Sequence, residues 1–359
     1  MMRSWVLWYN NVDANMEMMN RIAIVILNWN GSKMLHRFLP AVLACSQEAD
    51  IVVADNHSTD DSVRMLRESF PQVRLIELEQ NLGFAQGYQV ALAQVKAEFY
   101  VLLNNDVEVT PGWLGPLCQY MDSHPQVAAC QPKLRCLWNR SRFEYAGACG
   151  GYVDALGYPY CRGRVMAVVE TDEGQYDAVA SVLWATGAAL FIRSQVYWEV
   201  GGLDGRFFAH QEEIDLCWRI RSRGYGVACV PQSVVFHWGG GTLPKDSPHK
   251  TYLNFRNNLL LLYKNLPDDR LSRVMRIRWL LDALASLQFL AKGNMASFWA
   301  VWRARRDFCS LKHRFRADRE ENLRKTVVSP VPEQTDISIL WQYYVRWRRT
   351  FTQLPNQII

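Results

Sequence analysis

Three apolar runs, IAIVILNWN (22–30), DIVVADN (50–56) and FYVLLNND (99–106), decide the fold of this 359-residue chain. Each run is rich in β-branched or aromatic residues and ends in polar ones, which is typical of a parallel strand buried on both faces. One more strand is predicted at 73–78, and helical patterns separate the strands, at about 33–44, 58–70 and 85–96. Because strands and helices alternate through short links, the chain is predicted to be an α/β protein with a Rossmann-like, mostly parallel sheet flanked by helices.

Polar side chains follow three of the predicted strands at the points where the strands end. They are Asn28, Asn30, Asp55, Asn56, Asn104, Asn105 and Asp106. Any one of them is explained equally well by a turn, because Asn and Asp are common turn formers. Their joint placement instead predicts a ligand site, because open parallel sheets bind ligands outside the carboxyl ends of their strands.

The segment YVLLNNDVEV (100–109) places one of these residues, Asp106, just past a hydrophobic strand. A carboxylate fixed by a buried strand is well placed to hold a hard divalent ion. Mg²⁺ and Mn²⁺ prefer a few protein oxygens together with diphosphate oxygens and water. The segment therefore predicts a divalent metal cofactor, Mg²⁺ or Mn²⁺, that bridges a diphosphate and neutralises a leaving group.

A helix is predicted over HQEEIDLCWRIRSRGY (210–225), beginning near Glu212 and ending at Gly224. Two readings of its acidic first turn, which holds Glu212, Glu213 and Asp215, remain open. Acidic residues there suit the helix dipole and need no further role. Alternatively, one carboxylate is the general base that takes a proton from an attacking hydroxyl.

Eight sequence words, in this order, resemble the family-2 glycosyltransferases, which have the GT-A fold, and most closely their bacterial rhamnosyltransferase-like branch. They are VILNWNG (25–31), VVADNHSTDDS (52–62), NLGFAQG (81–87), LLNNDVEVTPGWL (102–114), ATGAALFIR (185–193), GGLDGRFFAHQEEIDLCWRIRSRGY (201–225), VVFHWGGGT (234–242) and FRNNLLLLYKNLP (255–267). The resemblance implies an inverting glycosyltransferase that moves a sugar from a nucleoside-diphosphate donor, dTDP-rhamnose or a UDP-sugar, to a hydroxyl of a cell-surface glycan or lipid-linked acceptor. General-base, metal-assisted single displacement is the implied mechanism.

The resemblance also implies roles for particular residues. Donor binding would fall to the strand-end residues other than Asp106, together with Gly83 and Gly187. Asp106 would be the main metal carboxylate, because Asn104 stands where the family's DxD motif has its first Asp. His237 would be a second metal or diphosphate ligand, although a lone His after a strand is more often a packed or surface residue.

The remaining implied roles concern catalysis and the acceptor. Glu213 would be the base, with Asp215 orienting neighbouring groups and Glu212 completing the acidic set. Acceptor or diphosphate contacts would fall to Trp238, Arg256 and Asn257. Two departures stand out: Gln89 replaces an expected Asn, and the family's Glu-Asp pair reads Glu212-Glu213 here.

The net charge of +5 conceals one strongly basic segment, 270–316, which alone carries +9. Its predicted helices mix Trp, Leu and Phe with Arg. That composition favours equally an interfacial helix on an anionic membrane and a helical subdomain with a solvated basic face. A sugar-nucleotide nucleotidyltransferase and a nucleic-acid binder using the basic tail are the alternative functions. The first is disfavoured because NWNGSKMLHRF (28–38) lacks a glycine-rich loop, and the second because it would not need the carboxylates; no nucleic-acid partner is expected.

Three regions are expected along the chain: a disordered, dispensable leader at 1–20, a GT-A domain at 21–244 and a C-terminal helical extension at 245–359. The nine cysteines form no CxxC pair, so neither a disulfide framework nor a zinc site is expected. No secretory signal and no run of 18 apolar residues is present. A cytoplasmic protein is therefore expected, or one held peripherally at the inner face of the cytoplasmic membrane.

Overall fold

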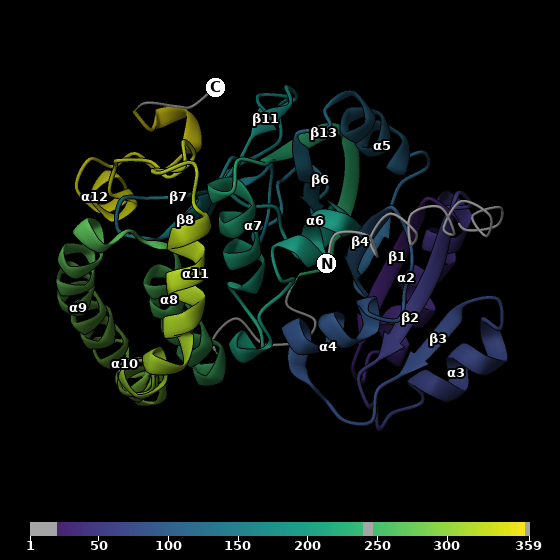
Figure 1. Ribbon diagram of the computed structural model, residues 1–359, viewed down its shortest axis with the longest axis horizontal. Helices are drawn as coiled ribbons and strands as arrows, with labels where there is room; N and C mark the ends of the chain where they lie inside the picture. The colour runs from purple at the N-terminus through teal and green to yellow at the C-terminus, as the bar shows by residue number, and fades with distance from the viewer. Residues whose placement is uncertain (1–19, 240–246, 356–359) are drawn as a thin grey trace, which may run out of the picture.

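A computed structural model describes residues 20–239 and 247–355 of the chain. Its main sheet has nine strands in the order β11-β13-β6-β12-β4-β1-β2-β3, with β5 paired to β13 (Figure 1). The strands are β1 (Ile22–Asn28), β2 (Ala49–Asp55), β3 (Arg74–Glu77), β4 (Phe99–Asn104), β5 (Val107–Val109), β6 (Val127–Cys136), β11 (Ala180–Ser181), β12 (Ala189–Arg193) and β13 (Gly226–His237). The helices that belong to the sheet are α2 (Ser32–Cys45), α3 (Ser62–Ser69), α4 (Gly83–Leu92), α5 (Leu114–Ser123), α6 (Ser194–Glu199), η2 (Gly205–Phe207) and α7 (Glu212–Ser222).

The first half of the sheet is parallel and follows directly from the apolar runs. β1 pairs with β2 and with β4, so that Asn28 lies opposite Asp55 and Leu27 lies opposite Asn104. Burial on both faces is complete along β1, where residues 23–25 have no exposed surface. The three polar strand ends therefore meet at one edge of the sheet, as predicted.

The second half of the sheet is mixed, because β12 runs antiparallel to both β4 and β6. A separate four-stranded sheet lies in the chain between β6 and β12. It consists of β7 (Gly151–Val153), β8 (Pro159–Cys161), β9 (Arg164–Val165) and β10 (Val168–Val169).

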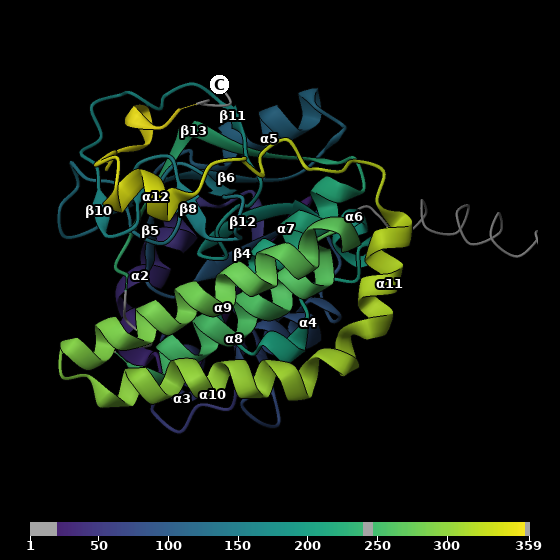
Figure 2. The same ribbon diagram turned by 90° about the vertical axis from the view of Figure 1, so that its left-hand side faces the viewer.

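The C-terminal region is helical, as predicted, and packs against the sheet domain (Figures 1 and 2). It consists of α8 (Pro248–Asn265), α9 (Asp268–Ala291), α10 (Met295–Leu311), η3 (Lys312–Phe315), α11 (Arg316–Lys325), α12 (Ile339–Tyr344) and η4 (Phe351–Gln353). The apolar core is continuous across the expected boundary at 245, because Leu259–Leu262 of α8 are fully buried in the same cluster as Trp184 and Leu190. Among the described helices, none is long and apolar enough to cross a membrane.

One predicted helix begins later than its sequence suggested. The helix expected at 58–70 begins at Ser62. The preceding residues instead bind the strand ends: the Ser58 N–H donates to Asp55 and the Thr59 N–H donates to Asn30. The backbone N–H groups of Ser58 and Thr59, which were expected in the first turn of the helix, thus hold strand-end side chains in place. The expected leader falls almost entirely on residues 1–19, outside the described part of the chain.

Candidate active site

The ends of β1, β2 and β4 form one hydrogen-bonded cluster. Asn28 Nδ2 donates to Asp55 Oδ1 at 3.1 Å, and Asn105 Nδ2 donates to Asn28 Oδ1 at 2.9 Å. The Ser58 hydroxyl donates to the same Asp55 oxygen at 2.6 Å. Asn28 and Asp55 are almost fully buried, while Asn104 and Asn105 are partly exposed. The cluster therefore presents amide groups to the sheet edge over a fixed, buried base.

A second set of contacts joins β2 to the start of α4. Asn56 donates to the Gly83 carbonyl and to Asn81 Oδ1, both at 3.0 Å. Gly83 has a φ of +74°, and a side chain there would overlap the ring of Phe208. The Phe208 carbonyl in turn accepts from the Phe84 N–H at 2.7 Å. Glycine is thus required at position 83, where the loop that precedes α7 closes onto α4.

Asp106 and His237 lie side by side, although 131 residues separate them. His237 ends β13, which pairs with β5, and Asp106 immediately precedes β5. His237 Nε2 lies 3.0 Å from Asp106 Oδ1, and its Nδ1 lies 3.3 Å from Glu144 Oε1. Burial lowers the pKa of His237, but the carboxylates of Glu144 and Asp106 outweigh burial and raise the pKa to about 10. The site is thus an anionic pocket that attracts positive charge.

The spacing of Asp106 and His237 is that of a direct hydrogen bond, and it also equals the spacing of two ligands of one divalent ion. Two neighbouring ligands of an octahedral ion, each about 2.1 Å from the metal, lie about 3.0 Å apart, and the observed distance is 3.0 Å. His237 Nδ1 is buried without a hydrogen-bond partner among the described residues. Within the same residues, no group of three or more His, Cys, Asp or Glu side chains is arranged as a metal cage. Two protein ligands suit Mg²⁺ or Mn²⁺, whose remaining positions are filled by phosphate oxygens and water.

Glu212 and Glu213 form the first turn of α7, and their Oε2 atoms are buried without hydrogen-bond partners in the described part of the chain. Burial raises the pKa of Glu213 to about 7. Burial and the neighbouring Glu213 raise the pKa of Glu212 well above its ordinary value. Gly187 keeps the adjoining space open, because a Cβ there would lie 3.3 Å from the Phe84 ring and 3.8 Å from Glu213 Cβ. A carboxyl group that titrates near neutral pH is suited to exchange a proton with a substrate.

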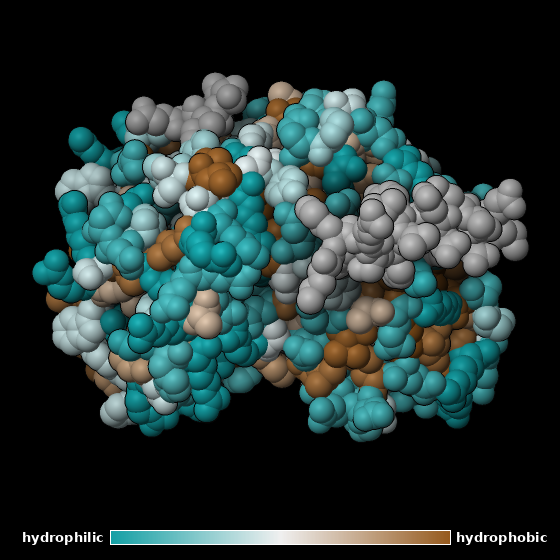
Figure 3. Space-filling view, in the orientation of Figure 1, coloured by the Kyte–Doolittle hydropathy of each residue, from teal (hydrophilic) through white to brown (hydrophobic). Residues whose placement is uncertain are grey.

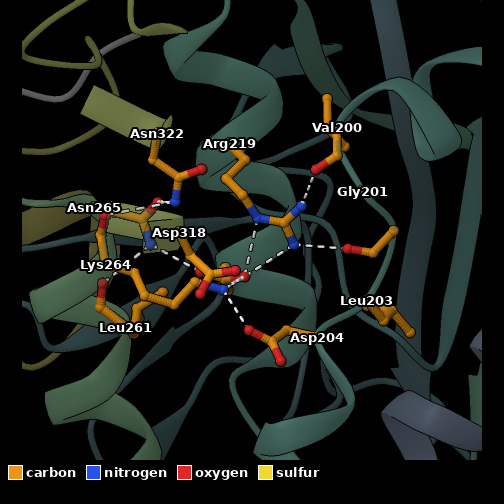
Figure 4. Close-up of polar contacts among 12 residues, drawn as sticks. Val200, Gly201, Leu203, Asp204, Arg219, Leu261, Lys264, Asn265, Asp318 and Asn322 are labelled. Atoms are coloured by element: carbon orange, nitrogen blue, oxygen red, sulfur yellow. Dashed lines mark hydrogen bonds and ion pairs between the residues drawn. The ribbon is translucent and has the colours of Figure 1, made fainter. Parts of the chain in front are cut away.

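Asp215 differs from its two acidic neighbours, because it is fully buried and fully paired. Its carboxylate contacts Arg219 at 2.9 Å, Lys264 at 2.8 Å and Asn265 at 2.9 Å. Burial raises its pKa, but Lys264 and Arg219 outweigh burial and lower the pKa below its ordinary value. Figure 4 shows Arg219 and Lys264 converging from α7 and α8, with Asp204 beside Lys264. Asp215 therefore joins α7 to α8 and cannot accept a substrate proton directly.

Two of the three residues expected to contact acceptor or diphosphate, Arg256 and Asn257, bind the loop before α7. Asn257 is fully buried and donates to the carbonyls of Phe207, Ala209 and His210 at 2.8–2.9 Å. Arg256 donates to the Phe207 carbonyl at 2.8 Å. The Asn257 amide is therefore used to brace the loop that leads to Glu212, and a contact of Asn257 with a ligand stays a prediction. Arg256 braces the same loop.

Trp238 packs on the sheet edge next to the proposed metal site, where its backbone N–H donates to the Asp106 carbonyl at 3.0 Å. Its ring lies 3.8 Å from that of Trp138 and 6.2 Å from that of Phe38, between ring centroids. Arg37 stacks over it at 4.7 Å. The glycines that follow, at 240 and 241, lie outside the described residues.

Two residues near the site had no sequence signal. Glu144 joins His237, although it lies in an irregular loop and in none of the family words. Arg164, on β9, is buried, stacks over Tyr145 at 4.9 Å, and its Nε has no hydrogen-bond partner among the described residues. The only sequence hint was that both charged residues stand in the apolar and glycine-rich segment 143–165.

Comparisons with known proteins agree with this architecture. Residues 23–154 match the family model Glycosyl transferase family 2. The N-acetylglucosaminyl-diphospho-decaprenol L-rhamnosyltransferase of Mycobacterium tuberculosis is 24% identical over 285 residues, which cover 74% of this chain and 91% of the relative. The low-salt glycan biosynthesis hexosyltransferase Agl10 of Haloferax volcanii is 22% identical over 266 residues, which cover 71% of this chain and 80% of the relative.

Solved structures share the fold at low sequence identity. GalNAc-T7 with UDP, GalNAc and Mn²⁺ has a TM-score of 0.56 and 15% identity, covering 92% of this chain and 57% of that one. TarS 1–349 of S. aureus in complex with UDP-GlcNAc has a TM-score of 0.52 and 14% identity, covering 85% of this chain and 89% of that one.

The fold and the family match define the class of protein: an enzyme with the GT-A fold that transfers sugars. The chain is a glycosyltransferase, and its residues 23–154 match glycosyl transferase family 2.

Proposed function

We propose that the protein is an inverting, metal-assisted glycosyltransferase in which Glu213 is the general base. The observation that carries the proposal is the environment of Glu213. Its carboxyl group has a pKa of about 7 and a buried oxygen without a hydrogen-bond partner among the described residues, and it lies beside the space that Gly187 leaves open. At neutral pH such a group is ionised in a large fraction of molecules. It can therefore take the proton of an attacking hydroxyl and release it again afterwards.

The other residues have supporting roles in this proposal. Asn28, Asp55 and Asn105 hold the nucleoside, as the family resemblance implies, and Asp106 and His237 hold a divalent ion. When bound, Mg²⁺ or Mn²⁺ would neutralise charge on the diphosphate leaving group. Burial and the neighbouring Glu213 raise the pKa of Glu212, which disfavours a second negative charge beside the base.

The acceptor class is proposed from the relatives. The printed name of the M. tuberculosis relative gives a diphospho-decaprenol acceptor and a rhamnosyl donor, and that of the H. volcanii relative gives glycan biosynthesis. We infer a lipid-linked saccharide as acceptor and dTDP-rhamnose or a UDP-sugar as donor, in the assembly of a cell-surface glycan. Arg164, buried and positively charged near Glu144, is the best-placed residue to contact a phosphate.

The test is release of nucleoside diphosphate from a panel of dTDP-, UDP- and GDP-sugars, with Mn²⁺ and a lipid-linked acceptor. One donor should be consumed, release should require the metal, and Asp106→Ala should abolish it. Asp61→Ala is the control, because Asp61 is an exposed carboxylate beside the same sheet edge. Pyrophosphate release from a nucleoside triphosphate and a sugar phosphate would favour a nucleotidyltransferase instead. A mobility shift of nucleic acid without sugar transfer would favour a nucleic-acid binder.

A further inference from the structure

Helix α9 buries polar side chains and exposes apolar ones. Its buried row carries polar groups at positions four residues apart: Arg278, Asp282 and Ser286, each at most 2% exposed. Its opposite, exposed row carries three leucines, Leu280, Leu284 and Leu287, which are 55–62% exposed. These leucines share one helical face, because they are spaced by four and three residues. A helix facing only water would show the reverse pattern.

The buried polar row is used by a network within the protein. Arg278 donates to Asn258 on α8 and lies 3.4 Å from Asp282, which also pairs with Arg305 on α10. Asn258 Nδ2 lies 3.2 Å from Gln211 Oε1, and Gln211 directly precedes Glu212. The polar interior therefore fixes α9 and α10 to the start of the proposed catalytic helix.

The apolar surface gathers at the turn between α9 and α10. Past the three leucines come Leu290, Met295 and Trp299, all 39–61% exposed. Figure 2 shows this turn at the end of a long helical hairpin, away from the sheet. Over α8 and α11, by contrast, the surface in Figure 3 is mostly hydrophilic. Seven of the exposed large apolar residues thus lie on the hairpin: Trp279, Leu280, Leu284, Leu287, Leu290, Met295 and Trp299.

Exposed arginines flank the apolar residues of the α9–α10 turn on both helices. On α9, Arg273 and Arg276 are exposed and precede Leu280 on the same face. On α10, Arg303 and Arg306 are exposed and follow Trp299. A groove of about 520 Å³ between α8 and α10 brings Trp299 and Tyr252 together with these two arginines. The hairpin therefore has an apolar tip, formed by the leucines, Met295 and Trp299, and next to it a cationic collar, formed by the four arginines.

We propose that the α9–α10 hairpin is a membrane-binding surface for anionic phospholipids. The leucines and Trp299 enter the boundary of the acyl chains, and the collar arginines contact lipid phosphates. The partner is inferred to be an anionic bilayer from charge complementarity. Residues 270–316 carry a net charge of +9, and anionic bilayers attract such segments. The proposal extends the proposed function, which requires a lipid-linked acceptor, but membrane binding is measurable without any sugar transfer.

The test is sedimentation of the full chain with phosphatidylglycerol vesicles and with phosphatidylcholine vesicles. The wild-type chain should bind the anionic vesicles and dissociate as salt rises. Leu284→Glu/Leu287→Glu should lower the partition coefficient at least about tenfold. The double variant loses two leucines that would enter the bilayer and adds two negative charges that anionic lipid repels. Arg273→Gln/Arg276→Gln should lower binding to phosphatidylglycerol about fivefold per arginine. Val327→Glu is the matched control, because Val327 is 74% exposed outside the hairpin, and its binding should equal wild type.

Transfer assays separate this proposal from the proposed function. With a water-soluble, short-chain acceptor the double Glu variant should keep wild-type turnover, whereas transfer to acceptor embedded in anionic vesicles should fall about tenfold. If the chain binds vesicles but transfers no sugar, the proposed function is wrong and the membrane-binding surface still stands. Absent vesicle binding, equal binding by all variants, or a dimer that the double Glu variant dissolves would overturn the membrane surface; the dimer would assign the hairpin to a second copy of the chain.

Discussion

At the scale of single residues, the central distinction is between Glu213 and its neighbours. Glu213→Gln should lower kcat by roughly 10²–10⁴, the range expected for loss of a general base, with little change in donor affinity. Glu212→Gln is the matched control and should leave most of kcat, because in the proposed mechanism Glu213, and not Glu212, takes the acceptor proton. Steady-state kinetics of both variants decide the assignment, which is wrong if the large defect belongs to Glu212.

The pH dependence follows from the same group. Burial raises the pKa of Glu213 from an ordinary value of 4.5 to about 7, so kcat should rise with pH and reach half its plateau near pH 7. The protonated form is favoured by folding, so this group stabilises the protein below about pH 4.5 and loses that contribution as pH rises through 7. Glu213→Gln should therefore melt higher than wild type at pH 8 and equally at pH 4.5. A higher melting temperature for wild type at pH 8 would contradict the raised pKa.

At the scale of elements, the junction of α7 and α8 depends on Asp215. Asp215→Asn leaves Lys264 and Arg219 with an uncompensated buried charge and should lower the free energy of unfolding by about 3–5 kcal/mol. The control is Glu320→Gln on α11, whose exposed partner Arg316 makes a surface pair worth less than about 1 kcal/mol. Denaturant unfolding measures both. Equal, small effects would show that Asp215 does not join the two helices.

The same scale shows what sequence could and could not predict. The strands ending at Asn28, Asp55 and Asn104 were predictable, because buried parallel strands have a continuous apolar signature. The approach of His237 to Asp106 was available only through family resemblance, since no local pattern joins residues 131 positions apart. Glu144 and the inverted face of α9 were not predictable, because both depend on which elements pack against them. The bracing role of Asn257 was not predictable either, because a polar residue that caps a buried loop has the same sequence signature as one that binds a ligand.

At the scale of the whole molecule, Phe351 packs the C-terminal segment against the small second sheet. Phe351 is 6% exposed, and its ring centroid lies 5.4–6.1 Å from those of Tyr152, Tyr160 and Tyr176. Phe351→Ala should lower the free energy of unfolding by about 3–5 kcal/mol through lost burial and a cavity. Trp347→Ala, in the same segment but 68% exposed, should cost less than about 1 kcal/mol. If thermal unfolding does not separate the two variants, the C-terminal segment does not stabilise the sheet domain.

In the proposed function, the strand-end edge of the GT-A sheet binds the donor, Glu213 on α7 is the base, and the helical region is fixed to α7 through Asp215. Its central claim is a single displacement at the sugar's anomeric carbon, with Glu213 taking the acceptor proton. The most direct measurement is the anomeric configuration of the product, determined by NMR on the disaccharide made from a donor of known configuration. The account predicts inversion; a product that retains the donor's configuration would contradict it.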